Sequence, residues 1–258
     1  HDGPRRRTPL PARLALRPAP RSSGEKNGRF SNDSFNDYKQ IIICKLILHS
    51  LHPKIIAIIS AIMPITALPR TIRANYEIHE WRHASAILER DFPSEWKDIC
   101  DVLSRFRLCA SFVKTPGGRK SQVSEWIDGE LYKKGWTERE FDTSVVVDGT
   151  ATESPTHSVD CYKNRVALEI EWNNKDPFFD RDLNNFRLLF DLRVISVGII
   201  VTRCDSLQAI FDKLGRGKSY GASTTHMSKL LPKIEGGGGG GCPVLVFGIK
   251  DSLYDQNC

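Results

Sequence analysis

Two apolar segments set narrow limits on how this chain can fold. Residues 194–203 (VISVGIIVTR) and 242–250 (CPVLVFGIK) read as strands that are apolar on both faces, so both faces of their sheet need a covering layer. Ser94 and Ser121 are expected N-caps of two earlier helices. The order of these patterns predicts an α/β fold with a mixed central β-sheet flanked by helices. Helices are predicted at 83–92, 93–108, 121–135 and 180–193, and further strands at 143–148, 157–162 and 165–172.

The formal net charge of +6 comes from the beginning of the chain. Residues 1–62 hold 11 Lys and Arg against 4 Asp and Glu, whereas residues 63–258 hold 26 against 27. The longer part is therefore nearly neutral, and any affinity for a polyanion there needs a local patch of basic residues. The first 40 residues are rich in Pro, Arg, Ser and Asn without a sustained period, which is typical of a disordered arm.

Residues 41–62 are apolar but are interrupted by Lys45, His49 and His52. Neither uninterrupted piece reaches the ~18 to 20 residues that a membrane-spanning helix needs, so no membrane association is predicted. Two interpretations of residues 1–62 remain open. They form an upstream extension, with the functional domain at 63–258 beginning near Met63, or they form a basic arm with an interaction helix.

The cysteines are odd in number and scattered along the chain, at positions 44, 100, 109, 161, 204, 242 and 258. They form no C-x-x-C pair, and the histidines show no zinc-ligand spacing around them. We therefore expect reduced thiols in a cytoplasmic protein, without a zinc site or a disulfide framework.

Two glutamates stand one residue apart in an otherwise apolar strand, VALEIEW at 166–172. Glu169 and Glu171 point to the same side, about 6.6 Å apart along the strand, while Leu168 and Ile170 take the other side. Like charges held this close resist burial unless a cation or a solvated cleft compensates them. The segment is therefore a candidate site, and the alternative is a pair of edge-strand glutamates that bind surface Arg or Lys.

A hairpin adds a third carboxylate to this pair. If Lys163 and Asn164 form its two-residue turn, Asp160 faces Ala167 and lies on the same side as the two glutamates. Converging carboxylates suit Mg²⁺, which prefers hard oxygen ligands and keeps waters and substrate phosphate oxygens in its shell. Bound Mg²⁺ would polarise a phosphoryl oxygen and make hydroxide available near neutral pH.

Asp160 followed after eight residues by Glu169-Ile170-Glu171 resembles the PD-(D/E)xK nucleases, in the variant that has Glu or Gln in place of the final Lys. Segments across residues 79–250 look like the BglII-type restriction endonucleases and, more distantly, BamHI, whereas residues 1–62 carry no resemblance. The matching segments are HASAIL, EWKDICDVL, GELYKKGW, VALEIEWNN, VGIIVTR and CPVLVFGI.

The resemblance implies that Asp160 and Glu169 bind the metal and that Glu171 helps to position or activate water. It places a loop that contacts base edges directly after the catalytic strand, where an Asn amide can pair with adenine; the alternative is a simple turn, since Asn, Asp and Pro favour turns. This loop holds Asn173, Asn174, Lys175 and Asp176. A further polar active-site residue of the family follows a Trp, and the matching position after Trp136 here is Arg139, flanked by Glu138 and Glu140.

Two segments, 114–121 (KTPGGRKS) and 213–226 (KLGRGKSYGASTTH), combine glycine, basic and hydroxyl residues of the kind that position phosphates. The second aligns with a base-contacting region of the family, and the alternative for both is a solvated loop. The spacing in GRGKS does not fit a nucleotide-binding loop. The candidate DNA-binding residues in these segments are Arg119, Lys120, Lys218, Ser219, Tyr220, Ser223 and Thr224.

The sequence therefore predicts a Mg²⁺-dependent type II restriction endonuclease that acts as a homodimer on a palindromic double-stranded DNA site. A cognate DNA methyltransferase is the expected functional partner, and a GATC-centred hexamer is the site that the resemblance suggests. A repair or recombination nuclease with the same core is the alternative enzyme. A DNA-binding protein without catalysis is the alternative from another class, and it is disfavoured because all three carboxylates are present.

Overall fold

The computed structural model describes residues 68–115, 120–153 and 156–258, so the predicted extension at 1–62 lies outside the described residues. The helices are α3 (Arg70–Asn75), α4 (Ala84–Asp91), α5 (Pro93–Arg105), α6 (Ala110–Lys114), α7 (Gln122–Tyr132), α8 (Phe178–Asp191), α9 (Gln208–Lys213) and α10 (Met227–Glu235), with 3-10 turns η2 (Asp205–Leu207) and η3 (Asp251–Leu253). The strands are β1 (Tyr76–Trp81), β2 (Leu108–Cys109), β3 (Thr137–Arg139), β4 (Ser144–Val147), β5 (Thr150–Glu153), β6 (Val159–Lys163), β7 (Val166–Ile170), β8 (Val197–Arg203), β9 (Val244–Ile249) and β10 (Tyr254–Asp255).

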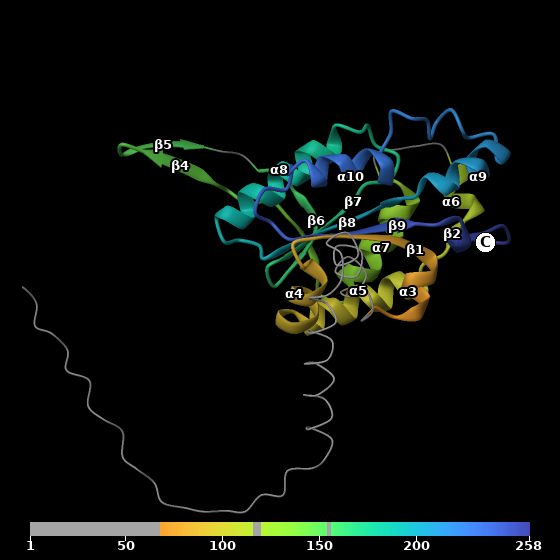
Figure 1. Ribbon diagram of the computed structural model, residues 1–258, viewed down its shortest axis with the longest axis horizontal. Coiled ribbons are helices and arrows are strands. Elements are labelled where there is room, and N and C mark those ends of the chain that lie inside the picture. Colours follow the sequence, from red (N-terminus) through yellow and green to blue (C-terminus); the bar gives the residue numbers. More distant parts are fainter. Residues whose placement is uncertain (1–67, 116–119, 154–155) are drawn as a thin grey trace, which may run out of the picture. The chain divides into compact units, whose positions relative to one another are not determined.

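A six-stranded mixed sheet in the order β1-β9-β8-β7-β6-β3 forms the centre of the described fold (Figure 1). The central strands β7, β8 and β9 are parallel, whereas β1 pairs antiparallel with β9, β6 with β7, and β3 with β6. Parallel neighbours need crossover connections, which α8 provides between β7 and β8, and α9 and α10 provide between β8 and β9. The predicted α/β fold with a mixed sheet flanked by helices is confirmed.

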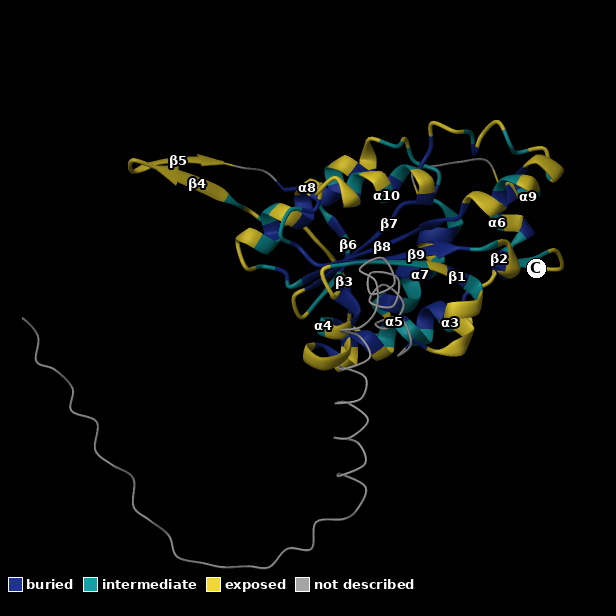
Figure 2. Ribbon diagram, in the orientation of Figure 1, coloured by how far each residue is buried: buried dark blue, intermediate teal, exposed yellow. Residues whose placement is uncertain are grey.

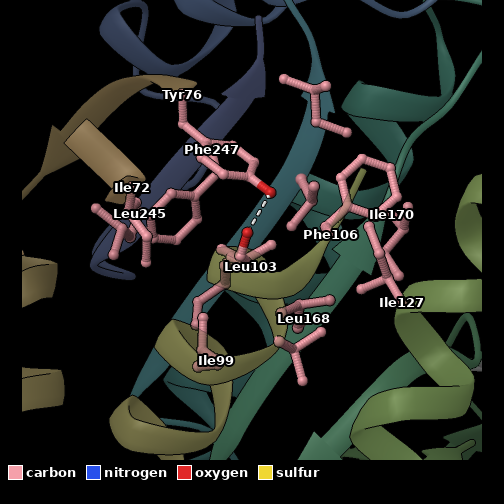
Figure 3. Packing of buried hydrophobic residues seen from close by; sticks show 14 of the residues in the cluster. Ile72, Tyr76, Ile99, Leu103, Phe106, Ile127, Leu168, Ile170, Leu245 and Phe247 are labelled. Atoms are coloured by element: carbon pink, nitrogen blue, oxygen red, sulfur yellow. Dashed lines mark hydrogen bonds between the residues drawn. The ribbon is translucent and has the colours of Figure 1, made fainter. Parts of the chain in front are cut away.

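Both faces of the sheet are covered, as the two apolar segments required. All residues of β8 and β9 are buried. One hydrophobic cluster packs α3, α4, α5 and α7 against the first face, and a second packs α8 and α10 against the other (Figure 2). Figure 3 shows part of the first cluster, where the Tyr76 hydroxyl donates a hydrogen bond to the Leu103 carbonyl at 2.9 Å.

Some local predictions were wrong. The edge strand β1 was not predicted, because its alternation breaks after Ile78 and only its pairing with β9 defines it. Helix α5 begins at Pro93 with Phe92 as its N-cap, so Ser94 lies inside the first turn; proline favours that first position since it has no N–H to satisfy. The Ser121 cap of α7 is confirmed, because its hydroxyl accepts a hydrogen bond from the Ser124 amide at 3.0 Å.

The expectation of reduced cysteines is wrong for one pair. Cys109 and Cys258 form a disulfide with their Cα atoms 4.9 Å apart. The parallel pairing of β10 with β2, which sets Asp255 opposite Cys109, brings the end of the chain beside a residue 149 positions earlier. The other cysteines of the described residues, at 100, 161, 204 and 242, are free thiols. None of the described helices has the length and apolar character needed to cross a membrane.

Candidate active site

The β6–β7 hairpin turns one residue later than predicted. Its two turn residues are Asn164 and Arg165, with φ of 44° and 68°, as a type I′ turn requires. Lys163 consequently pairs with Val166. This register sets Cys161 opposite Leu168, and the turn places Arg165 in a conformation uncommon for its side chain.

The corrected register brings Asp160 opposite Glu169 rather than Ala167. The Asp160 amide donates to Glu169 Oε2 at 3.4 Å, and Asp160 Oδ2 accepts a hydrogen bond from the Ile170 amide at 2.9 Å. Asp160 is half-buried, whereas Glu169 is only 1% exposed. The two carboxylates that were predicted to bind metal thus lie on directly paired strands, at the edge between the protein interior and solvent.

Glu171 follows the end of β7 and keeps its place in the sheet, because its amide donates to the Val201 carbonyl of β8 at 2.9 Å. Glu169 and Glu171 alternate with Leu168 and Ile170, which belong to the cluster under α5 and α7. The glutamates therefore face the side that α8 covers. The two-sided character predicted for this strand is confirmed. The alternative of edge-strand glutamates is wrong, because β7 lies between β8 and β6 and both side chains are buried, although Glu171 does pair with Arg181.

Helix α8 adds two charged residues that were not among the predicted site residues. Arg181 Nη2 lies 3.2 Å from Glu171 Oε1 and 2.8 Å from Asp182 Oδ1. Asp182 is fully buried, and its Oδ2 has no hydrogen-bond partner. The signal that could have identified Asp182 is its position on the apolar face of α8, at helical spacing from Phe179, Phe186 and Leu189.

Asn174 is held against the candidate site rather than directed only outward. Its side-chain amide donates to Glu171 Oε2 at 2.8 Å, and its backbone is bonded to Thr225 in both directions, at 2.8 and 3.1 Å. Asn173 has a φ of 62°, which Asn tolerates better than most residues. Both oxygens of Glu171 therefore have a partner, Arg181 on one and Asn174 on the other.

The three buried carboxylates resist simultaneous ionisation. Burial raises the pKa of Glu171 to about 9, and the neighbouring Asp182 charge adds to this increase. Burial also raises the pKa of Glu169 well above its ordinary value, with further repulsion from Asp182 and Asp160. The pKa of Asp182 is raised by burial as well, against the opposing effects of its contacts with Glu171 and Arg181. Without an added cation, Glu171 therefore retains its proton at neutral pH.

The side-chain oxygens of Asp160 and Glu169 are suitable ligands for a divalent cation. Glu169 Oε1 is buried without a hydrogen-bond partner, and a cation beside it would both satisfy that oxygen and favour ionised carboxylates. Asp160 and Glu169 supply hard oxygen ligands of the kind Mg²⁺ takes. However, no three His, Cys, Asp or Glu side chains within 68–115, 120–153 and 156–258 are grouped so as to hold a metal ion. The pair would therefore need water or substrate oxygens to complete a metal shell.

A second, smaller cluster of charged residues contacts Cys161 of β6. Lys120 pairs with the buried Asp128 at 2.5 Å, and the Cys161 thiol donates to Asp128 Oδ1 at 3.3 Å. Burial, together with repulsion from Asp160, raises the pKa of Asp128 to about 6 despite the opposing Lys120. Lys120, predicted to contact DNA, is thus fixed near Asp160, whereas Arg119 lies outside the described residues.

The two predicted DNA-binding loops lie side by side. Lys175 bridges Thr224, and the Asp176 amide donates to the Ser223 carbonyl at 3.1 Å. Two residues of the second loop have structural roles instead of surface ones. Tyr220 is buried and stacks on Phe211, and Thr224 is buried with its hydroxyl accepting from Arg203 at 2.8 Å. Among the candidate DNA-binding residues of the two loops, the exposed ones are Lys175, Lys218, Ser219 and Ser223.

The region from Glu138 to Glu140, where a further active-site residue was sought, is exposed along its length. Arg139 lies over the rings of Phe141 and Tyr162, 4.8 and 5.0 Å from their centroids, and Glu138 accepts a hydrogen bond from Ser158 at 3.2 Å. None of these contacts reaches the carboxylate cluster, and the additional buried carboxylate beside Glu171 is Asp182.

A mixed sheet whose hairpin sets paired acids beside a third carboxylate, next to loops with exposed basic and hydroxyl side chains, defines a nuclease-like α/β protein. The family of restriction endonucleases BglII/BglIII matches residues 76–249, from the first residue of β1 to the last of β9. The chain belongs to this family, whose members are endonucleases that act on DNA. A search among curated proteins gave no match.

Proposed function

We propose that this chain is a Mg²⁺-dependent type II endonuclease that hydrolyses both strands of a palindromic double-stranded DNA site as a homodimer. The observation that carries the proposal is the direct pairing of Asp160 with Glu169, followed by Glu171 on the same side of β7. These residues lie within the segment matched to the restriction endonuclease family. The remaining residues of the site have roles that follow from their contacts.

Asp160 and Glu169 would hold the metal ion, since Glu169 Oε1 has no partner of its own. When bound, Mg²⁺ polarises a phosphoryl oxygen and lowers the pKa of coordinated water. The Ile170 amide keeps the Asp160 carboxylate in place. Because Glu169 is almost completely buried, it cannot turn away into solvent, and the paired strands fix the separation of the two acids.

Glu171 would orient the attacking water and accept its proton. Arg181 and Asn174 each hold one of its oxygens, at 3.2 and 2.8 Å. Both contacts favour the ionised carboxylate, against the effect of burial on its pKa. In the typical PD-(D/E)xK motif a lysine stands at this position, and here the nearest positive charge comes from Arg181 of α8.

DNA contacts are proposed for the paired loops 173–176 and 218–224. Their backbone bonds join them into one unit, so a base contact in the first loop and a phosphate contact in the second would be kept in fixed register. Lys175, Lys218, Ser219 and Ser223 are exposed and suited to phosphate, whereas the burial of Tyr220 and Thr224 excludes them from this part of the proposal. Asn173, Asn174 and Asp176 would face the bases.

The test is cleavage of supercoiled plasmid DNA by the purified full chain, with Mg²⁺ or with EDTA, followed by sequencing of the ends. Discrete fragments with one recurring palindromic sequence would support the proposal. Cuts without a recurring sequence, or cuts confined to branched DNA, would favour a repair or recombination nuclease, and binding without cleavage would favour a non-catalytic protein. Asp191→Asn, a substitution at an exposed site on α8, is the control for later variants of the acids.

Further predictions concern residues 1–62, a partner methyltransferase and the cellular location. We propose that residues 63–258 are sufficient for specific cleavage, so removal of residues 1–62 should weaken only salt-sensitive nonspecific binding. A cognate methyltransferase that protects the same site and a cytoplasmic location both stay predictions. Co-expression offers a direct check, because a methyltransferase of matching specificity would make host DNA resistant to the enzyme.

A further inference from the structure

Arg203, the last residue of β8, places a guanidinium inside the protein. The residue is only 1% exposed, and its Nε is buried without a hydrogen-bond partner among the described residues. Burial lowers the pKa of Arg203 to about 10, against the opposing effect of the Asp205 charge, so the guanidinium stays protonated at neutral pH. Removing such a charge from water costs free energy, and its contacts therefore indicate its role.

The guanidinium holds two points of the segment that precedes α10. Arg203 Nη2 donates to the Tyr220 carbonyl at 2.9 Å and to the Thr224 hydroxyl at 2.8 Å. The Thr224 hydroxyl in turn donates to the Gly221 carbonyl at 2.8 Å. Hydrogen bonds from a charged donor are stronger than neutral ones, so Arg203 fixes the conformation of residues 220–225.

Residues 220–225 are bonded in turn to the loop that follows β7. The Thr225 amide donates to the Asn174 carbonyl at 2.8 Å, and the Asn174 amide donates to the Thr225 hydroxyl at 3.1 Å. The Asn174 side chain donates to Glu171 Oε2 at 2.8 Å. A series of short contacts thus leads from Arg203 through two loops to the Glu171 carboxylate.

Strand β8 also holds the backbone of Glu171. The Glu171 amide donates to the Val201 carbonyl at 2.9 Å, and the Thr202 hydroxyl donates to the Glu171 carbonyl at 2.8 Å. Consecutive residues of β8 therefore reach Glu171 in two ways. Val201 and Thr202 bind its backbone directly, whereas Arg203 reaches its side chain through the loops.

We propose that Arg203 is a positioning residue, which orders residues 220–225 and thereby keeps the Asn174 amide on Glu171. This inference rests on the proposed function, in which Glu171 orients the attacking water. Arginine suits the role because its planar fork presents donors in fixed directions, whereas a lysine ammonium is a point charge on a flexible stem. Arg203→Lys therefore keeps the charge and removes the fork.

Hydrogen–deuterium exchange on the full chain tests the coupling of the two loops without relying on activity. In Arg203→Lys, the amides of Thr225 and Asp176 should exchange at least about tenfold faster, because both are bonded from one loop to the other. Amides within β8 and β9 should keep their wild-type protection, which separates local loosening from global unfolding. Arg107→Lys is the matched control, since Arg107 is exposed and also donates to backbone carbonyls; it should leave both loops unchanged.

Single-turnover cleavage, on a duplex with the sequence recovered from plasmid ends, tests whether Arg203 acts through Asn174. Arg203→Lys and Asn174→Ala should each slow cleavage about tenfold, because a small displacement of a positioning group lowers the rate. The double variant should stay within about twofold of the slower single variant, whereas independent roles would combine to about a hundredfold loss.

Several results would overturn the proposal: multiplicative losses in the double variant, wild-type exchange at Asp176, or unchanged cleavage in Arg203→Lys. If urea unfolding shows that Arg203→Lys does not fold, Thr224→Val replaces it in both comparisons, because it removes the hydroxyl that Arg203 binds. A wild type that does not cut DNA rejects the proposed function. Exchange at Thr225 and Asp176 then still decides whether Arg203 positions the two loops.

Discussion

The two sides of β7 have opposite chemistry over the same few residues. Leu168 and Ile170 belong to a dry cluster under α5 and α7 (Figure 3). Glu169 and Glu171, between and beside them, are equally buried but face carboxylate, guanidinium and amide groups from α8 and the following loop. Burial of the apolar side stabilises the fold. Burial of the acidic side disfavours ionised carboxylates and raises the pKa of both glutamates.

This difference indicates that the acidic side is kept for chemistry and not for stability. Apolar side chains of similar size at 169 and 171 would pack under α8 without electrostatic cost, as buried charged groups are often replaced without loss of stability. The contacts that hold Glu171 from two directions reduce the cost but do not remove it. We therefore expect substitutions on the two sides of β7 to separate activity from stability.

The largest effect is expected on cleavage from the acidic side. Asp160→Asn or Glu169→Gln should lower the cleavage rate by at least about a thousandfold, by removing charge that stabilises the transition state. Their unfolding free energies in EDTA should not fall, because both substitutions remove repulsion within the cluster. Plasmid cleavage with Mg²⁺ and urea unfolding measure the two quantities. Wild-type turnover by either variant, with Asp191→Asn also active, would remove these acids from the mechanism.

The next effect is expected on stability from the apolar side. Leu168→Ala should lower the unfolding free energy by about 2–5 kcal/mol, since it leaves a cavity in the close-packed cluster. The folded fraction should still cleave the same sequence, because the acids face the other way. Urea unfolding and cleavage corrected for the folded fraction provide the test, and a stable variant that has lost activity would show that the two sides are not separable.

The pH dependence of the unfolding free energy also distinguishes the acidic side of β7 from its apolar side. Glu171, with its pKa raised from 4.5 to about 9, binds a proton in the folded state that the unfolded chain releases at lower pH. Its contribution is therefore fully present below about pH 4.5 and is lost as pH rises toward 9. The unfolding free energy in EDTA should fall over this window. Glu171→Gln should flatten the slope, and an unchanged slope would mean that Glu171 is ionised throughout.

The smallest effect is expected from Asn174, which contacts the acidic side from the loop. If its amide reads a base, Asn174→Ala should cost about 1 to 3 kcal/mol of discrimination at one base pair per half-site. If it only holds Glu171, cleavage of all sites should slow equally and relative preferences should stay the same. Competition cleavage of single-base variants decides between these roles, with salt dependence of binding as the control for phosphate contacts.

The sequence alone determined the features that depend on local periodicity. Alternation along 166–172 placed two glutamates on one side of a strand whatever it pairs with, and the apolar segments 194–203 and 242–250 required a sheet covered on both faces. Helical spacing and the Ser121 cap defined α7 in the same way. These features follow from side-chain geometry within a few residues, and the structure confirms them.

Only the tertiary structure decided which distant groups meet. Neighbouring strands, not the alternation within 76–81, define β1, and the return of β10 beside β2 brings Cys258 to Cys109. The pairing of β6 with β7 decided the hairpin register, and packing of α8 carried Asp182 and Arg181 to Glu171. These contacts form because folding buries apolar surface contributed by residues that are far apart in the chain. The identity of those distant partners cannot be read from a short segment of sequence.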